Sequence, residues 1–141
     1  MNGRVWSDPE VAERILRSFT TWAVVGCSSR PWRASFGVSR YLISQGYTVV
    51  PINPKEDVVH GERAYPDLRS APSGIEVVDL FRRSDLVLPH VTEAIEIGAK
   101  AVWMQLEVWN VEADELAADA GMLVVMDRCP AIDHPQMIGA R

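Results

Sequence analysis

The feature of this chain that most limits its fold is an apolar stretch that ends at a glycine and leads into a polar loop. Residues 22–25 read Trp-Ala-Val-Val, Gly26 follows, and the loop after it leads to a helical pattern that opens near Ser35. A buried strand that feeds a helix in this way aims unpaired backbone N–H groups at whatever lies beyond the strand. The loop also carries serine hydroxyls and two arginines, Arg30 and Arg33. The stretch therefore predicts a site for a phosphate or pyrophosphate group.

Apolar runs and helical stripes alternate along the rest of the chain. Further strands are predicted at 47–52, 75–81, 100–105 and 122–126, and helices at 8–18, from Ser35 to Gly46, after Pro89 and at 113–120. A short edge element is predicted around 58–64, and residues 127–141 are predicted to be loop with a final turn. The strands are continuous apolar runs, which is typical of a parallel sheet covered on both faces. The predicted fold class is therefore α/β, a single Rossmann-like domain over 1–141 with a doubly wound parallel sheet of about five strands and helices on both faces.

Composition limits the classes of partner. The 141 residues have a formal net charge of −5 and no block of Lys and Arg, so no nucleic-acid partner is expected. Cys27 and Cys129 are too few for a disulfide framework and form no Cys-x-x-Cys pair, which favours reduced thiols. The sequence has no signal-peptide core and no apolar run of about 18 residues, so neither export nor a membrane span is expected. We expect a cytoplasmic protein.

Ligands of open parallel sheets bind beyond the carboxyl ends of the strands, where the strand order reverses. The Gly-x-Gly-x-x-Gly fingerprint of dinucleotide sites is missing here, because Cys27 and Ser28 follow Gly26. The second strand ends in Asn53 instead of the acidic residue that holds the ribose of NAD. NAD is therefore disfavoured, whereas the charge of Lys55 leaves NADP open.

Several separated motifs together resemble one family. They are Trp22-Ala-Val-Val-Gly-Cys-Ser with Pro31, Arg33 and Ser35, then Tyr41-Leu42, Gly46-Tyr47, Pro51-Ile-Asn-Pro54, Gly61 with Tyr65-Pro66, Val78-Asp-Leu-Phe-Arg-Arg83, Gly98-Ala-Lys100, Trp103-Met-Gln105 and Val125-Met-Asp-Arg-Cys129. In this order they resemble the small bacterial CoA-binding proteins, which are stand-alone domains similar to the N-terminal, CoA-binding domain of the succinyl-CoA synthetase α subunit. The resemblance covers roughly residues 20–130 and implies coenzyme A (CoA) or an acyl-CoA as the ligand.

The resemblance also implies roles for residues at the strand ends. Gly26, Ser28, Arg33 and Ser35 would cradle the pyrophosphate. The other implied positions are Asn53, Pro54 and Lys55 near the adenosine and its 3′-phosphate, Phe81, Arg82 and Arg83 on the adenine or phosphate side, and Gln105 facing the pantetheine arm. Glu107 departs from the family pattern, which has a small residue there, usually glycine. Its carboxylate is expected to crowd or repel the ligand.

Two further residues near the strand ends have two interpretations each. Asp79 either contacts the ligand or pairs with a neighbouring arginine. Cys129 either meets the thiol end of the ligand or packs as a small core residue, and we favour the core.

No nucleophile–base pair and no catalytic pair of carboxylates is evident in the sequence. His60, His90 and His134 lie in three separate loops without metal or triad spacing, which predicts surface or capping roles. We therefore predict binding of CoA or acyl-CoA without catalysis, in a carrier, a sensor or a partner-dependent subunit. Two alternatives remain: an NADP-binding Rossmann domain of an oxidoreductase or redox sensor, and an interaction module whose ligand site has decayed. A protein partner and a homodimer both stay open.

Overall fold

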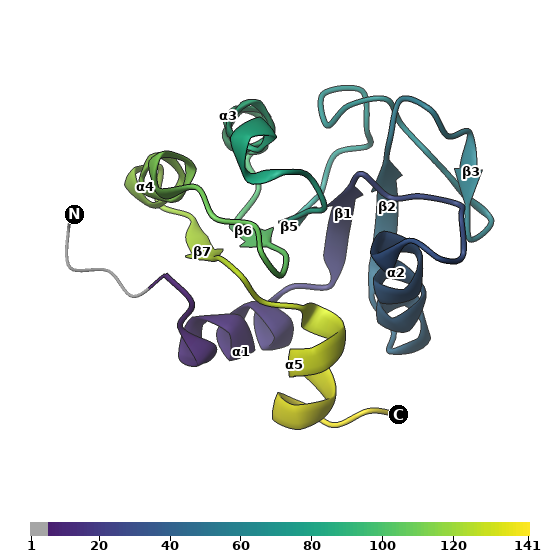
Figure 1. Ribbon diagram of the computed structural model, residues 1–141, viewed down its shortest axis with the longest axis horizontal. Helices are drawn as coiled ribbons and strands as arrows, with labels where there is room; N and C mark the ends of the chain where they lie inside the picture. Colours follow the sequence, from purple (N-terminus) through teal and green to yellow (C-terminus); the bar gives the residue numbers. More distant parts are fainter. Residues whose placement is uncertain (1–5) are drawn as a thin grey trace.

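A five-stranded parallel sheet forms the centre of the molecule. The computed structural model describes residues 6–141, and the strand order in the sheet is β2-β1-β5-β6-β7 (Figure 1). The order reverses between β1 and β5, so the chain leaves β1 in one direction and returns to β5 on its other side. The strands are β1 (Thr21–Val25), β2 (Thr48–Ile52), β5 (Val77–Leu80), β6 (Ala101–Met104) and β7 (Leu123–Val125).

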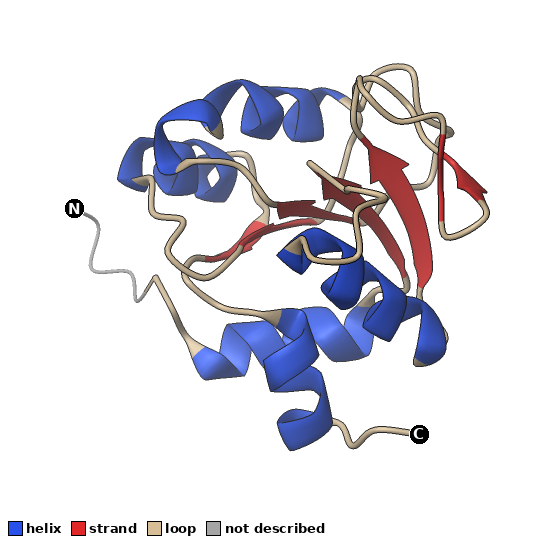
Figure 2. Cartoon of the chain, turned by 45° about the vertical axis from the view of Figure 1, so that its right-hand side comes forward, coloured by secondary structure: helices blue, strands red, loops and turns tan. Residues whose placement is uncertain are grey.

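Helices cover both faces of this sheet (Figure 2). On one face, α3 and α4 pack over a core that includes Val78, Leu80 and Val102. On the other face, α1, α2 and α5 pack over a core that includes Trp22, Val24 and Trp103. The helices are α1 (Pro9–Ser18), α2 (Ala34–Ser44), α3 (Leu88–Glu96), α4 (Val111–Asp119) and α5 (Pro130–Met137). The predicted α/β fold class is confirmed, since both faces of the parallel sheet bury apolar side chains.

A small hairpin lies beside the edge of the sheet. Strands β3 (Val58–Val59) and β4 (Glu62–Arg63) pair antiparallel, which confirms the edge element predicted around 58–64. His60 and Gly61 connect them with positive φ angles of 55° and 76°, as a tight two-residue hairpin turn requires. A bridge between Ile52 and Tyr65 joins the end of this segment to β2.

The prediction for residues 127–141 is wrong in part, because α5 occupies 130–137. Pro130 stands at the first helical position, where its missing N–H removes no helical hydrogen bond. Pro135 lies inside the helix and does remove one, so the local pattern indicates a turn. Tertiary packing stabilises the helix instead, because α5 lies against α1 and α2.

Helix α1 begins next to its predicted start, whereas the start predicted for α3 needs correction. The side chain of Asp8 accepts a hydrogen bond from the Glu10 N–H at 2.9 Å, so Asp8 caps α1. Helix α3 begins at Leu88 and therefore includes Pro89 in its first turn instead of following it. A 3-10 turn, η1 (Ser84–Leu86), precedes that helix.

Within residues 6–141, no helix is long and apolar enough to cross a membrane.

Candidate functional site

The carboxyl ends of β1, β2, β5 and β6 surround a cavity of about 880 Å³. It lies at the reversal of strand order between β1 and β5, where open parallel sheets bind their ligands. The residues that line it are Val25, Gly26, Ser28, Ser29, Arg30, Arg33, Ala34, Ser35, Ile52, Asn53, Pro54, Lys55, Glu56, Pro66, Phe81, Arg82, His90, Gln105, Leu106 and Val108. We call it the switch-point cavity.

Gly26 allows the chain to turn out of the sheet at the end of β1. Its φ is +83°, and a Cβ atom at this position would lie 2.5 Å from the Phe81 carbonyl oxygen. Its N–H donates to the Ile52 carbonyl at 2.8 Å, so the turn is fixed between the ends of β2 and β5. A side chain would displace the Phe81 backbone, which lines the same cavity.

The loop from Ser28 to Ser35, which we call the phosphate loop, is held by its own side chains. The Ser35 hydroxyl accepts a hydrogen bond from the Ser28 N–H at 3.1 Å, and the Ser28 hydroxyl accepts one from the Arg30 N–H at 3.1 Å. Ser35 is therefore buried inside the loop and does not cap α2. The N-cap of α2 is Arg33, whose side chain makes no capping bond. This helix start faces the cavity with positive electrostatic potential.

The loop after β2 is tied to the phosphate loop by Asn53. The Asn53 side-chain amide donates to the Cys27 carbonyl at 3.0 Å, and its oxygen accepts from the Lys55 N–H at 3.0 Å. Both polar ends of this amide are thus used by the protein itself. Asn53 shapes the rim of the cavity, whereas the Lys55 ammonium stays available there.

Glu56 was not expected in the site, but it bonds directly to the phosphate loop. One carboxylate oxygen accepts from the Ser29 N–H at 2.7 Å, and both oxygens accept from the Ser29 hydroxyl at 2.8 and 2.9 Å. These bonds lower the pKa of Glu56, and the charge of Arg30 adds to the effect. Glu56 is three residues beyond Asn53, so a search restricted to the strand end misses it.

Of the two adjacent arginines after β5, only Arg82 lines the cavity. The Arg83 side chain pairs with Asp85 at 3.0 Å, and both side chains are largely exposed, at 76% and 66%. All other predicted site residues lie in the lining. Arg83 is therefore brought to the surface beside the site and not into it.

Asp79 has neither of the two predicted partners. It is completely buried, and the Gln105 side-chain nitrogen donates to its two carboxyl oxygens at 2.9 and 3.2 Å. Burial raises the pKa of Asp79 well above its ordinary value, because the charged form of the carboxyl loses its hydration. Gln105 itself lines the cavity, and its hydrogen bonds to Asp79 fix the orientation of its side-chain amide.

His90 lies in the cavity lining, contrary to the predicted surface or capping role. Its Nδ1 is 3.7 Å from a carboxylate oxygen of Glu93 one turn along α3. Burial lowers the pKa of His90, and the nearby charge of Arg82 lowers it further. The imidazole in the cavity lining is therefore harder to protonate than a histidine in water. The prediction is also wrong for His134, which is buried and bonds to the Tyr41 hydroxyl, whereas His60 is half-buried and bonds to the Ser39 hydroxyl.

The two thiols lie outside the cavity lining. Cys27 is fully buried, and burial raises its pKa to about 11, while its sulfur contacts the Ser39 hydroxyl at 3.6 Å. Burial also raises the pKa of Cys129, whose side chain meets that of Gln105. The predicted core role of Cys129 agrees with its 7% exposure. Among residues 6–141, no cluster of His, Cys, Asp and Glu side chains is arranged to hold a metal ion.

A family model described as the CoA binding domain matches residues 20–135 of this chain. The chain belongs to the CoA-binding domain family. The uncharacterized protein YneT of Bacillus subtilis is 35% identical over 128 residues, which cover 91% of this chain and 94% of YneT. A hypothetical protein from Pyrococcus horikoshii has a solved structure that superposes with a TM-score of 0.90, at 37% identity over 99% of this chain and all of that one.

A longer protein also contains this fold. The dinucleotide-forming acetyl-coenzyme A synthetase 1 of Ca. Korarchaeum cryptofilum matches with a TM-score of 0.66 and 28% identity. The match covers 78% of this chain but only 26% of the synthetase, so the family fold is one part of that longer chain. The family resemblance predicted from the separated motifs is confirmed.

Glu107, the departure from the family pattern, lies outside the switch-point cavity. Its φ is +67°, in the left-handed region that glycine adopts without strain, which gives a backbone reason for glycine at this position. Its N–H donates to a carboxylate oxygen of Asp127 at 2.7 Å, and this bond holds the turn. The expectation that the Glu107 carboxylate crowds the ligand finds no support in the lining.

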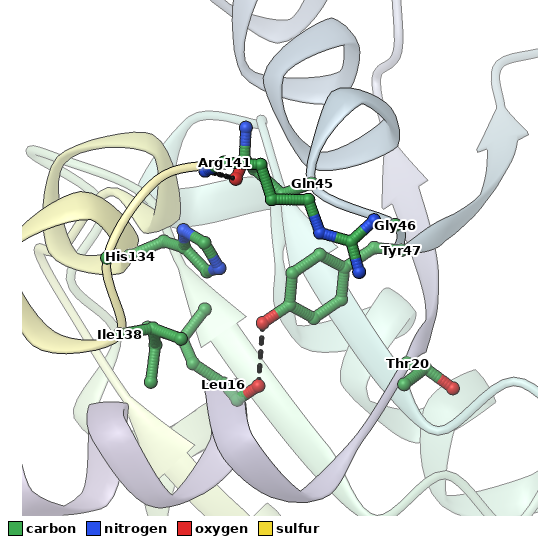
Figure 3. A pocket seen from close by; sticks show the side chains of 9 residues that line it. Leu16, Thr20, Gln45, Gly46, Tyr47, His134, Ile138 and Arg141 are labelled. Atoms are coloured by element: carbon green, nitrogen blue, oxygen red, sulfur yellow. Dashed lines mark hydrogen bonds between the residues drawn. The ribbon is translucent and has the colours of Figure 1, made fainter.

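A second cavity of about 250 Å³ lies at the other end of the sheet, where β1 and β2 begin (Figure 3). The Tyr47 hydroxyl donates to the Leu16 carbonyl at 2.6 Å beside it, and the Arg141 N–H donates to the Gln45 side chain at 2.7 Å. None of the predicted site residues lies here. The predicted site residues thus gather in the switch-point cavity, with the exception of Arg83.

Proposed function

We propose that this protein binds CoA or an acyl-CoA in the switch-point cavity, without catalysis of its own. The observation that carries the proposal is a set of unpaired cations in an acidic chain. Arg30, Arg33, Lys55 and Arg82 line the cavity, whereas the chain as a whole has a net charge of −5. Within residues 6–141, none of these four side chains forms an ion pair. Such cations favour a ligand with several phosphate groups, and CoA carries a pyrophosphate and a 3′-phosphate.

The proposed arrangement follows the strand ends. The pyrophosphate would lie on Gly26, Ser28, Arg33 and Ser35, beside the start of α2. The adenosine and its 3′-phosphate would lie near Asn53, Pro54 and Lys55, with Phe81 and Arg82 on the same side. The pantetheine arm would pass Gln105 and the apolar side chains of Leu106 and Val108. Arg83 is left out of this arrangement because Asp85 already pairs with it.

A binding role without chemistry agrees with the contents of the cavity. In the described part of the chain, neither a serine hydroxyl nor a cysteine thiol is hydrogen-bonded to His90, so no activated nucleophile is formed there. We propose a carrier, a sensor or a subunit that acts with a partner.

Calorimetric titration of the purified protein with CoA, acetyl-CoA, NADP and ADP tests this proposal. We expect a micromolar Kd for CoA, which corresponds to about −8 kcal/mol, and much weaker binding of NADP. Preference for NADP would favour the oxidoreductase alternative instead. Absence of binding by all four ligands would favour an interaction module with a decayed site.

A further inference from the structure

The cavity that carries the cations also contains one carboxylate. Among the described residues that line it, only Glu56 is acidic. Glu56 lies on the loop after β2, and its two oxygens bond to the backbone and the hydroxyl of Ser29 across the cavity. In the described part of the chain, Asn53 also links the loop after β2 to the end of β1, through the Cys27 carbonyl, but Glu56 makes this link with a charged group.

The donors that Glu56 occupies are those an anionic ligand needs. Ser29 follows Gly26 by three residues in the phosphate loop, and its N–H belongs to the set that a strand–loop–helix turn offers to phosphate. A carboxylate and a phosphate oxygen are chemically equivalent acceptors for such an N–H. In the free protein, Glu56 therefore stands where a phosphate oxygen would accept a hydrogen bond.

Glu56 and a bound phosphate would also repel each other. The Ser29 bonds lower the pKa of Glu56, so its charge is complete at neutral pH. Two negative charges a few ångströms apart in a partly enclosed site cost free energy, and this cost is added to that of breaking the Ser29 bonds. Arg30, which is near Glu56, offsets part of the repulsion.

We propose that Glu56 is an internal competitor for phosphate in the switch-point cavity. The Glu56 carboxylate occupies the Ser29 donors in the free protein and leaves them when pyrophosphate binds. The proposal rests on the proposed function for the identity of the natural ligand. Its consequence is selectivity: a small anion that offers one contact cannot displace Glu56, whereas a ligand that also engages Arg33, Lys55 and Arg82 can.

The test compares Glu56→Gln with Asp57→Asn by calorimetric titration with inorganic pyrophosphate and with CoA. Glu56→Gln keeps the size of the side chain and removes its charge. Asp57→Asn removes the same charge one residue away, from an exposed side chain outside the cavity. We expect Glu56→Gln to bind both ligands about fivefold to thirtyfold more tightly than the unmodified protein, and Asp57→Asn to change either Kd by less than about twofold. Unchanged melting temperatures would show that both variants are folded.

Titration with both ligands distinguishes a failure of this inference from a failure of the proposed function. Tighter pyrophosphate binding by Glu56→Gln without any CoA binding would support the competitor and reject CoA as the ligand. CoA binding that Glu56→Gln leaves unchanged or weakens would overturn the competitor, because Glu56 would then position Ser29 for the ligand. An equal gain in Asp57→Asn would overturn it as well, since the effect would be one of long-range charge.

Discussion

Adjacent residues at a strand end have different surroundings because one backbone step changes the direction of the side chain. Arg82 faces the switch-point cavity, whereas Arg83 turns outward to Asp85. The sequence shows two equivalent arginines, and only the turn into η1 distinguishes them. The sequence also does not indicate that Glu56 and His90 line the cavity. They reach it through the geometry of a loop and a helix, which their distance along the chain from the strand ends does not reveal.

Arg33 is the residue at which the proposed phosphate contact is most directly tested. We expect Arg33→Ala to weaken CoA binding by about 1.5–3 kcal/mol, a factor of about 13 to 160, because a charge-assisted hydrogen bond is lost. The measurement is the Kd by calorimetry. Arg83→Ala is the matched control, and it should leave the Kd unchanged because its guanidinium lies outside the cavity. Equal losses in both variants would indicate a general charge effect, and no loss in Arg33→Ala would remove Arg33 from the site.

At the scale of elements, the sequence predicts the strands and helices whose position is determined by the pattern of apolar residues. Val77, Val78 and Leu80 are the apolar residues of β5, and all are buried in the central strand of a parallel sheet. Helix α5 carries the opposite lesson. Pro130 and Pro135 argue against a helix when only neighbouring residues are considered. The helix forms because it packs on α1 and α2 and makes contacts with residues remote in sequence.

One of those contacts joins the start of α5 to the start of the chain. Arg128 pairs with Asp133 at 2.7 Å and donates to the Ser7 carbonyl at 3.0 Å, and its side chain is only 19% exposed. We expect Asp133→Ala to lower the free energy of unfolding by about 2–4 kcal/mol, because it leaves a mostly buried guanidinium without its carboxylate. Urea unfolding measures this change.

The exposed pair of Arg83 and Asp85 provides the control for that variant. Both side chains are mostly in water, so Asp85→Ala should cost less than about 1 kcal/mol. A similar small cost for Asp133→Ala would mean that solvent reaches Arg128 and that α5 is stabilised by its apolar contacts alone.

For the molecule as a whole, charge is distributed unevenly between the site and the rest of the chain. An acidic protein gathers four cations, which form no ion pair within residues 6–141, at the point where the strand order reverses. It also buries one carboxyl group, that of Asp79, in the central strand. The position of the cavity could be predicted, because parallel strands bring their carboxyl ends to one edge. The raised pKa of Asp79 could not, because it depends on the complete burial of that side chain.

The raised pKa of Asp79 predicts how the stability of the whole domain depends on pH. Its pKa is raised in the folded protein, whereas the unfolded chain ionises it near its ordinary pKa of about 3.9. The folded state therefore binds one proton more, and the free energy of unfolding falls by about 1.4 kcal/mol per pH unit above that value, up to the raised pKa. Asp79→Asn removes this titrating group and leaves every other carboxyl group in place. We expect urea unfolding between about pH 5 and about pH 8 to show a shallower decline for Asp79→Asn than for the unmodified protein. Parallel curves would mean that Asp79 is ionised in the folded state, and the bond from Gln105 would then be charge-assisted.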